Sequence, residues 1–291
     1  MLDFRYHALS LVAVFLALTI GIVLGVTIGD SLLSDAERSL RSNLRADVVS
    51  ARQNANKAQS ELAGRDQMLD QLYPSLVRDR LRGERVALVS WGPLPDGVEK
   101  GVRDAVHQGG GRLDSVAVFD KPLTELETAL GGSGDDVQNA SEASLDEMGR
   151  SLADGLIGDG RVGRQLQESF PDSFSGHFRH ADAVAFFEPP LPQGNADADG
   201  VKERGDDRAK RIQAAMLDEL QKRTIATVGV ETTGIDPSQI PHYESLKLST
   251  VDSVDKSGGR IALVFVLAGA QGNFGFKSTA KQPLPDEVLS P

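Results

Sequence analysis

The chain has 291 residues, enough for one or two domains. Its 42 Asp and Glu residues outnumber 31 Lys and Arg residues, so the formal net charge is −11. This acidic balance argues against nucleic acid as a partner, because phosphate binding needs a basic surface. The chain has no cysteine, which excludes disulfides, thiolate metal sites and cysteine nucleophiles.

The first thirty residues predict a membrane anchor. No Asp, Glu, Lys or Arg occurs between Arg5 and Asp30, and residues 8–29 are almost wholly apolar. A helix of this length, rising about 1.5 Å per residue, crosses a hydrocarbon core of about 30 Å. The alternative, a cleaved signal peptide, usually has a shorter apolar stretch and a small-residue cleavage site. We therefore expect residues 1–30 to form one uncleaved transmembrane helix.

A stripe of small residues along this span predicts helix pairing in the membrane. Small residues at every fourth position let two helix backbones approach closely. Such residues are also common in membrane helices generally. The stripe comprises Ala13, Ala17, Gly21, Gly25 and Gly29. For orientation, the short amino-terminal tail favours an extracytoplasmic domain, while the arginines that follow the span point the other way.

Residues 31–82 predict a long helix with a coiled-coil seam. Apolar residues recur at steps of mostly three and four, as in a heptad repeat. Together with the small-residue stripe, this spacing predicts a homodimer. The alternative is a single helix that packs against its own domain. The main seam positions are Leu33, Leu40, Leu44, Val48, Leu62 and Leu69.

Residues 83–270 predict an α/β domain, and residues 271–291 a carboxy-terminal tail. Apolar strands alternate with helical stretches, which is typical of a Rossmann-like or flavodoxin-like layered parallel sheet. The predicted strands are residues 85–91, 113–119, 183–187, 224–230 and 260–267. The predicted helices are residues 97–108, 123–130, 144–157, 163–170 and 207–223.

The sequence indicates no cofactor and no enzyme. The turn after the first predicted strand, residues 92–97, contains two prolines and lacks the glycine pattern of a dinucleotide site. Prolines there also remove backbone N–H donors. No nucleophile elbow, serine–histidine–aspartate spacing or zinc-protease motif occurs.

Two weak metal-site candidates stand out. His177 and His180 could share one helical face as ligands, although isolated histidines are more often surface residues. A second segment has partial calcium-loop spacing, because oxygen-bearing residues alternate before a glycine. An acidic solvated linker explains the same residues. These are Asn195, Asp197, Asp199 and Asp206.

Two segments carry a family resemblance. The first is Arg5, His7, Ala8, Ser10 and Leu11 with the apolar residues that follow them. The second is residues 249–252, Ser-Thr-Val-Asp, followed by Gly-Arg-Ile at 259–261. Both resemble the actinobacterial copper transporter family typified by MctB. The resemblance covers essentially the whole chain and implies a role in copper efflux at the cell envelope, with copper as the transported ion.

Two hypotheses follow. In the first, the chain belongs to a copper-export system without being the whole conduit, since one helix cannot enclose a channel. Cu(I) prefers thiolate and thioether ligands, yet there is no cysteine and the four methionines are scattered. In the second, the chain is a dimeric envelope scaffold whose coiled coil presents a protein partner or regulates cell-wall hydrolysis, as the resemblance implies for some related proteins.

Overall fold

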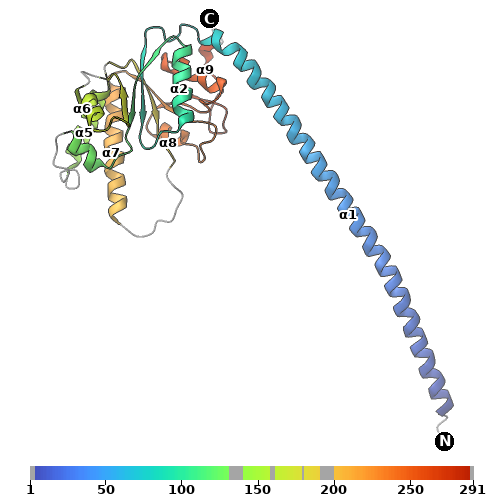
Figure 1. Cartoon of the computed structure of the whole chain (residues 1–291). Coiled ribbons are helices and arrows are strands. Elements are labelled where there is room, and N and C mark those ends of the chain that lie inside the picture. The colour runs from blue at the N-terminus through green and yellow to red at the C-terminus, as the bar shows by residue number, and fades with distance from the viewer. Residues whose placement is uncertain (1–3, 131–139, 158–160, 179, 191–199, 289–291) are drawn as a thin grey trace. The chain divides into compact units, whose positions relative to one another are not determined.

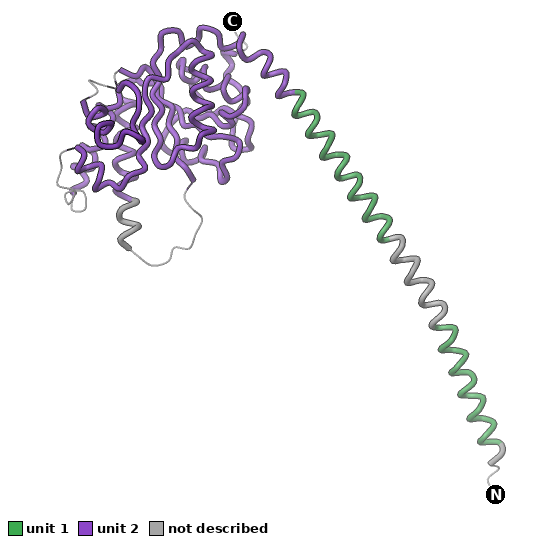
Figure 2. Tube along the Cα trace, viewed as in Figure 1, with its two compact units in different colours: residues 1–64 green, residues 65–291 purple. Residues whose placement is uncertain are grey.

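The computed structural model describes residues 4–130, 140–157, 161–178, 180–190 and 200–288 (Figure 1). The chain divides into two compact units, Met1–Gly64 and Arg65–Pro291 (Figure 2). Helix α1 (Phe4–Val77, 74 residues) forms the first unit and continues into the second.

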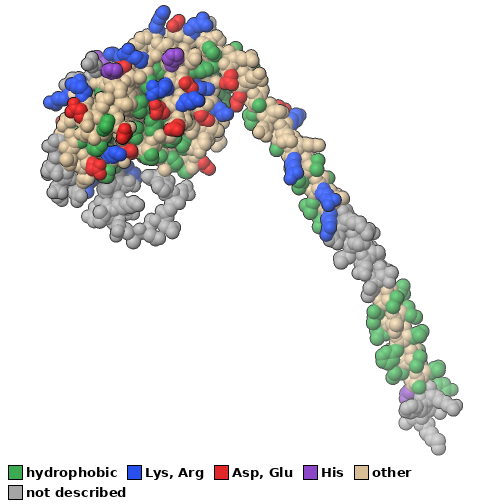
Figure 3. All heavy atoms as spheres, in the orientation of Figure 1, with side chains coloured by type: hydrophobic (Ala, Val, Ile, Leu, Met, Phe, Trp, Pro, Cys, Tyr) green, Lys and Arg blue, Asp and Glu red, His purple; other side chains and the backbone are tan. Residues whose placement is uncertain are grey.

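One segment of α1 is long and apolar enough to cross a membrane. It is Tyr6–Gly25, with a mean hydropathy of 2.6, and it is the one such segment in the described part of the chain. None of it is buried, and Figure 3 shows apolar side chains gathered around it. This agrees with the predicted anchor.

The second unit is an α/β domain around a seven-stranded sheet, in the order β3-β2-β1-β4-β5-β6-β7. Every neighbouring pair is parallel except β2 with β3. Counting parallel strands alone, the order is 2-1-3-4-5-6, which is the flavodoxin-like order 2-1-3-4-5 with one further short strand, β7, at its edge. The predicted fold class is therefore confirmed. The strands are β1 (Arg85–Ser90), β2 (Arg112–Val118), β3 (Phe174–Gly176), β4 (Ala183–Phe187), β5 (Ala226–Val230), β6 (Ser249–Val251) and β7 (Asn273–Phe274).

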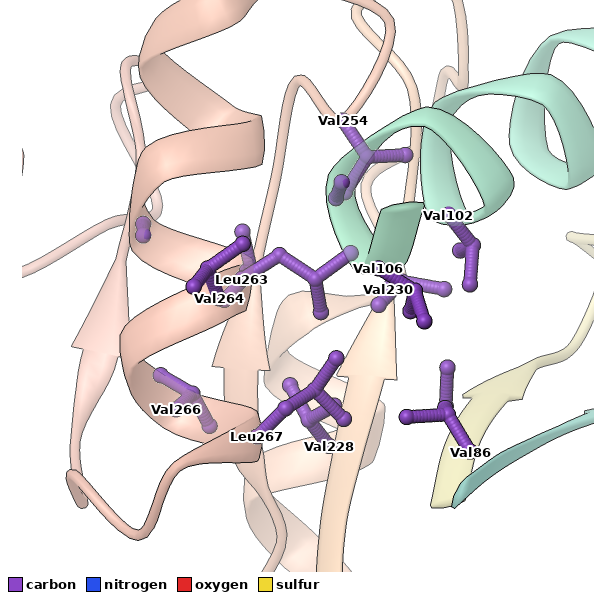
Figure 4. Packing of buried hydrophobic residues seen from close by; sticks show 14 of the residues in the cluster. Val86, Val102, Val106, Val228, Val230, Val254, Leu263, Val264, Val266 and Leu267 are labelled. Atoms are coloured by element: carbon purple, nitrogen blue, oxygen red, sulfur yellow. The ribbon is translucent and has the colours of Figure 1, made fainter. Parts of the chain in front are cut away.

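Helices cover both faces of the sheet and create two apolar cores. Along β1, Val86 and Leu88 belong to one core, while Ala87 and Val89 belong to the other, as strand alternation requires. Helices α2 (Asp96–Gln108) and α9 (Ser257–Leu267) build the first core (Figure 4). The second core is built by α3 (Leu123–Ala129), α5 (Glu142–Ile157), α6 (Arg161–Ser169), α7 (Gly200–Lys222) and α8 (Ile240–Ser245). A short 3-10 helix, η1 (Asp286–Val288), lies near the carboxy terminus.

The last turns of α1 belong to the first core. Tyr73, Val77 and Leu81 are buried there, and Leu69 and Leu76 pack against the same cluster while half-buried. Over these turns α1 therefore packs against its own domain. This is the arrangement given above as the alternative to a coiled-coil seam.

One predicted strand is a helix. Residues 260–267, expected as a buried strand, form most of α9. Ten of its eleven residues are buried, because α9 lies between the sheet, α2 and the end of α1. A helix enclosed on all sides has no polar stripe, so its apolar run cannot be distinguished from a buried strand by periodicity.

Candidate functional site

Acidic side chains line the carboxyl edge of the sheet. Glu188, Glu231 and Asp252 directly follow β4, β5 and β6, respectively. Because these strands are parallel, their carboxyl ends meet at one edge, which is where folds of this class bind ligands. From the sequence, Asp252 was noted only as the end of the Ser-Thr-Val-Asp segment, and Glu188 and Glu231 were not predicted as site residues, although each directly follows a predicted strand.

Glu231 is fully buried and paired with a lysine. One carboxylate oxygen accepts hydrogen bonds from Lys277 Nζ and Ser238 Oγ, both at 2.8 Å. The other accepts the backbone N–H of Gln239 at 2.6 Å. Lys277 also donates to the carbonyl of Ile235 at 2.6 Å. The buried charge is thus balanced and hydrogen-bonded, as a buried carboxylate requires.

Asp252 holds the carboxy-terminal segment against the sheet. Its carboxylate accepts the backbone N–H groups of Phe276 at 2.8 Å and Lys277 at 3.0 Å. Gly275 lies so close that a Cβ there would come within 2.1 Å of the Asp252 carboxyl carbon, at a φ of +148°. Glycine is therefore required at this position. Hydrogen bonds to Asp252 and Glu231 therefore hold Phe276 and Lys277 against the carboxyl edge of the sheet.

Glu188 forms a more accessible pair with His242. Its Oε2 accepts a hydrogen bond from Gln213 Nε2 at 2.6 Å and lies 3.0 Å from His242 Nε2. The His242 side chain is 38% exposed, and its hydrogen bond to Glu188 raises the histidine pKa. The hydroxyl of Tyr243 accepts the backbone N–H of Glu188 at 2.9 Å, and burial raises the pKa of this tyrosine. The contact with Glu188 thus favours the protonated form of His242.

At the crevice between β1 and β4, where this strand order switches direction, the backbone that follows β1 lies close to the chain that follows β4. A Cβ on Gly92 would lie 2.8 Å from the ring of Pro189, which follows β4. The first turn of α2 carries Asp96 and Glu99, so its positive dipole end already faces carboxylates. The described residues here do not form a phosphate cradle.

A second polar region lies between the last turns of α1 and the start of α9. It contains a cavity of about 190 Å³. The Ser257 hydroxyl donates to Asp70, and Lys256 Nζ lies 3.8 Å from an Asp66 oxygen. These contacts tie the end of α1 to the beginning of α9. The cavity is lined by Asp66, Leu69, Asp70, Asp255, Lys256, Ser257, Gly258 and Arg260.

Arg260 is the central residue of this polar region between α1 and α9, called the α1–α9 joint below. Its guanidinium contacts Asp104 and Ser257, each at 3.2 Å, and lies 5.4 Å from the centre of the Tyr73 ring. Next to it, a Cβ on Gly259 would lie 2.2 Å from the carbonyl oxygen of Ser253. Of the two parts of the late family-like segment, residues 249–252 form β6 and its acidic end. Residues 259–261 lie in the first turns of α9, where Arg260 contacts the end of α1.

The two predicted histidine ligands do not share a helical face. His177 and His180 follow β3 in non-helical, exposed chain, which corrects the premise of that metal site. The backbone N–H of His177 donates to Asp114 at 2.7 Å, because this segment extends the pairing at the sheet edge. His180 Nδ1 lies 3.2 Å from the carbonyl of Ile157. Among described residues, no group of three or more metal-binding side chains is present.

The candidate calcium loop lies mostly outside the described residues. Asn195, Asp197 and Asp199 belong to that part of the chain, and Asp206 lies on α7 with its side chain not described.

The predicted pairing residues lie on α1. Ala13 and Ala17 are exposed, and a Cβ on Gly21 or Gly25 would meet nothing within 4 Å. Gly29 lies in α1, without a description of its surroundings.

Four seam residues are exposed and one packs against the domain. Leu40 is 60% exposed, Leu44 54%, Val48 50% and Leu62 59%. Leu33 lies in α1 with its side chain not described, and Leu69 is half-buried against the first core. The exposed seam residues thus lie between residues 40 and 62.

Comparison with known proteins places this architecture among copper transport proteins. Residues 1–285 match the family model "Copper transport outer membrane protein, MctB". The chain is also similar to "Copper transporter MctB" of Mycobacterium bovis and of two strains of Mycobacterium tuberculosis, with 26% identity over 160 residues. The match covers 55% of this chain and 49% of each relative, so it spans about half the length of these curated relatives. No solved structure matches the chain.

Proposed function

Because the chain belongs to the MctB family of copper transport proteins, we propose that it acts in copper efflux at the cell envelope. The family match over residues 1–285 carries this proposal. We propose further that the chain is a single-pass, non-catalytic component and not a self-sufficient pore.

The composition of the chain supports a role as one component of a copper-export system and not as the whole conduit. It has no cysteine and four methionines, whereas Cu(I) prefers sulfur ligands. Met68 is exposed on α1, while Met216 is buried in the second core, so these two thioethers do not converge. Copper would then be handled by a larger assembly to which this chain contributes its anchor and its α/β domain.

We propose an extracytoplasmic position for the α/β domain. The matching family model describes a copper transport outer membrane protein, which supports this side of the membrane, whereas the arginines that follow the span point the other way. The Cys-free chain makes the test direct, since Lys247→Cys places a single thiol at an exposed position. Labelling of intact cells by a membrane-impermeant maleimide supports the proposal, and labelling only after lysis contradicts it.

The copper role is tested by the copper content of a deletion strain grown with added copper. We expect cell-associated copper to rise and to return to the parental level when the full-length gene is restored. A complementing gene that lacks the codons for residues 6–25 should not restore it, because the anchor is lost. Copper that stays at the parental level in the deletion strain contradicts the efflux proposal.

A second function is favoured by the exposed apolar residues of α1. Leu40, Leu44, Val48 and Leu62 are half or more exposed, so a homodimeric coiled coil would bury them. In this alternative, the dimer is a scaffold that binds an envelope protein partner and regulates cell-wall hydrolysis. Misshapen or chained cells with unchanged copper would support the scaffold over efflux.

The dimer itself is tested by crosslinking in membranes. With Leu40→Cys or Leu62→Cys as the single thiol, a short bismaleimide should join two copies. Val49→Cys, which lies next to the seam residue Val48 but on another face of α1, serves as the matched control. Equal crosslinking at Val49 and Leu62 would contradict a seam.

A further inference from the structure

The heptad positions of α1 can be assigned one by one between Leu44 and Leu62. Apolar residues alternate at steps of four and three over this segment, which is the d-to-a pattern of a left-handed coiled coil. All of them are exposed. A continuous apolar row on a helix is buried best by a second helix with the same spacing. The row is Leu44, Val48, Ala51, Ala55, Ala58 and Leu62.

Opposite charges lie on the two flanks of this row. With Val48 at an a position, Asp47 is the preceding g residue and Arg52 is the following e residue. Both side chains are exposed on α1. In a parallel pair of helices, a g residue of one chain lies beside the e residue of the next heptad in the partner. Two identical chains in this arrangement place Asp47 of each beside Arg52 of the other, twice by symmetry.

We infer that a second copy of this chain covers this face, parallel and in register, and that the Asp47–Arg52 pairs select this alignment. The inference rests on the homodimer proposed above and adds its direction, register and extent. Its occupant is the same chain because the apolar spacing and the Asp47–Arg52 pair are self-complementary. At the end of the row, the g residue Glu61 would meet the e residue Asp66, whose charge is paired with Lys256 of its own domain. The three alanines bury little area, so the charged pairs contribute a large share of the selectivity.

The membrane anchor supports the same alignment. Two chains whose Tyr6–Gly25 segments cross the same bilayer in the same sense run parallel. A slip of one heptad would displace one anchor by about 10 Å along its axis, and would move apolar residues out of the hydrocarbon core.

The pairing segment ends near Leu62. Arg65 occupies the next d position, where a charge interrupts the apolar row. Leu69, at the next a position, packs against the core of its own domain. The two chains therefore share the segment from Leu44 to Leu62, and each α/β domain keeps the last turns of its own α1.

Charge reversal in the full-length protein, in its native membrane, tests this inference. Leu62→Cys supplies a single thiol for crosslinking in every chain. One tagged chain also carries Asp47→Arg, and a second chain with a different tag carries Arg52→Asp. Either variant alone should lose dimer affinity by about tenfold, because two attractive pairs become repulsive. Coexpression of the two should restore crosslinking between differently tagged chains, since both cross-pairs are then attractive. Lys57→Glu, at an outward-facing c position, is the matched control and should change nothing.

The possible outcomes distinguish failure of the proposed register from failure of the proposed dimer. Preferential crosslinking between the two reversed chains supports the register. Crosslinking through Leu62→Cys without any such preference overturns the register but leaves the proposed dimer standing. Absence of crosslinking in the chain with unreversed charges overturns the dimer and the register together.

Discussion

Replacing Lys277 by methionine should strongly destabilise the α/β domain. Lys277→Met keeps the apolar stem but removes the cation that contacts Glu231, whose side chain is 0% exposed. Breaking a buried pair from one side costs about 3–5 kcal/mol. The Glu231 carboxylate keeps its bonds from Ser238 and Gln239, so we expect the lower end, about 3 kcal/mol. For a domain of this size, that corresponds to a fall in Tm of about 6–12 °C.

The fluorescence of the one tryptophan in the chain provides the assay. Trp91 lies at the carboxyl edge of the sheet, with its ring centre 5.1 Å from that of Phe119, so unfolding changes its surroundings. Thermal unfolding is followed for the full-length protein in detergent micelles. Lys281→Met is the matched control, because Lys281 and Glu244 are 73% and 36% exposed. Such an exposed pair contributes little to stability, so its loss should lower the Tm only slightly. A Tm change for Lys277→Met no larger than for this control refutes the reasoning.

Four further predictions use the same preparation. Gly259→Ala should lower stability by about 2–3 kcal/mol, because its Cβ meets a backbone oxygen at 2.2 Å. Gly64→Ala, where a Cβ meets nothing within 4 Å, should instead raise the stability of helix α1 by up to about 1 kcal/mol. Circular dichroism during heating distinguishes the two alanine variants, because one should melt earlier and the other later than the unaltered protein. The pKa of His242 is raised by Glu188, so their contact stabilises the fold fully below a pH of about 6.5 and less as the pH rises through the folded pKa. The Tm difference between the unaltered protein and His242→Gln should therefore shrink from pH 5.5 to 8.5, and a constant difference contradicts this linkage. Arg260→Ala should expose the end of α1 to limited proteolysis near residues 65–80, and an unchanged cleavage pattern would show that the α1–α9 joint does not depend on this guanidinium.

Long elements of the fold were predictable from the sequence, whereas short ones were not. Four predicted strands correspond to β1, β2, β4 and β5, because each is an apolar run of a length typical of buried strands. Strands β6 and β7 have three and two residues, too few for any periodicity. Helix α9 was wrongly predicted as a strand because burial on all sides removes the polar positions that identify a helix.

The site was less predictable than the fold. His177 and His180 attracted attention as a chemical pair, yet their spacing has meaning only on a helix, and neither histidine lies in one. The contacts of Glu231 depend on a lysine far along the chain, in residues expected to form only a tail. Pairings over such distances come from the topology of the sheet, which local patterns do not encode.

The embedding of α1 in the first core has a consequence for how the protein can be divided and made. Tyr73, Val77 and Leu81 are buried side chains that precede β1 in the chain. A secreted fragment that starts at residue 83 would lack them and expose an apolar groove, whereas one that starts at residue 65 would retain them. During synthesis, the first residues of the domain's core emerge while still attached to the membrane helix. The first segment of the domain's core and the apolar Tyr6–Gly25 segment therefore belong to one continuous helix.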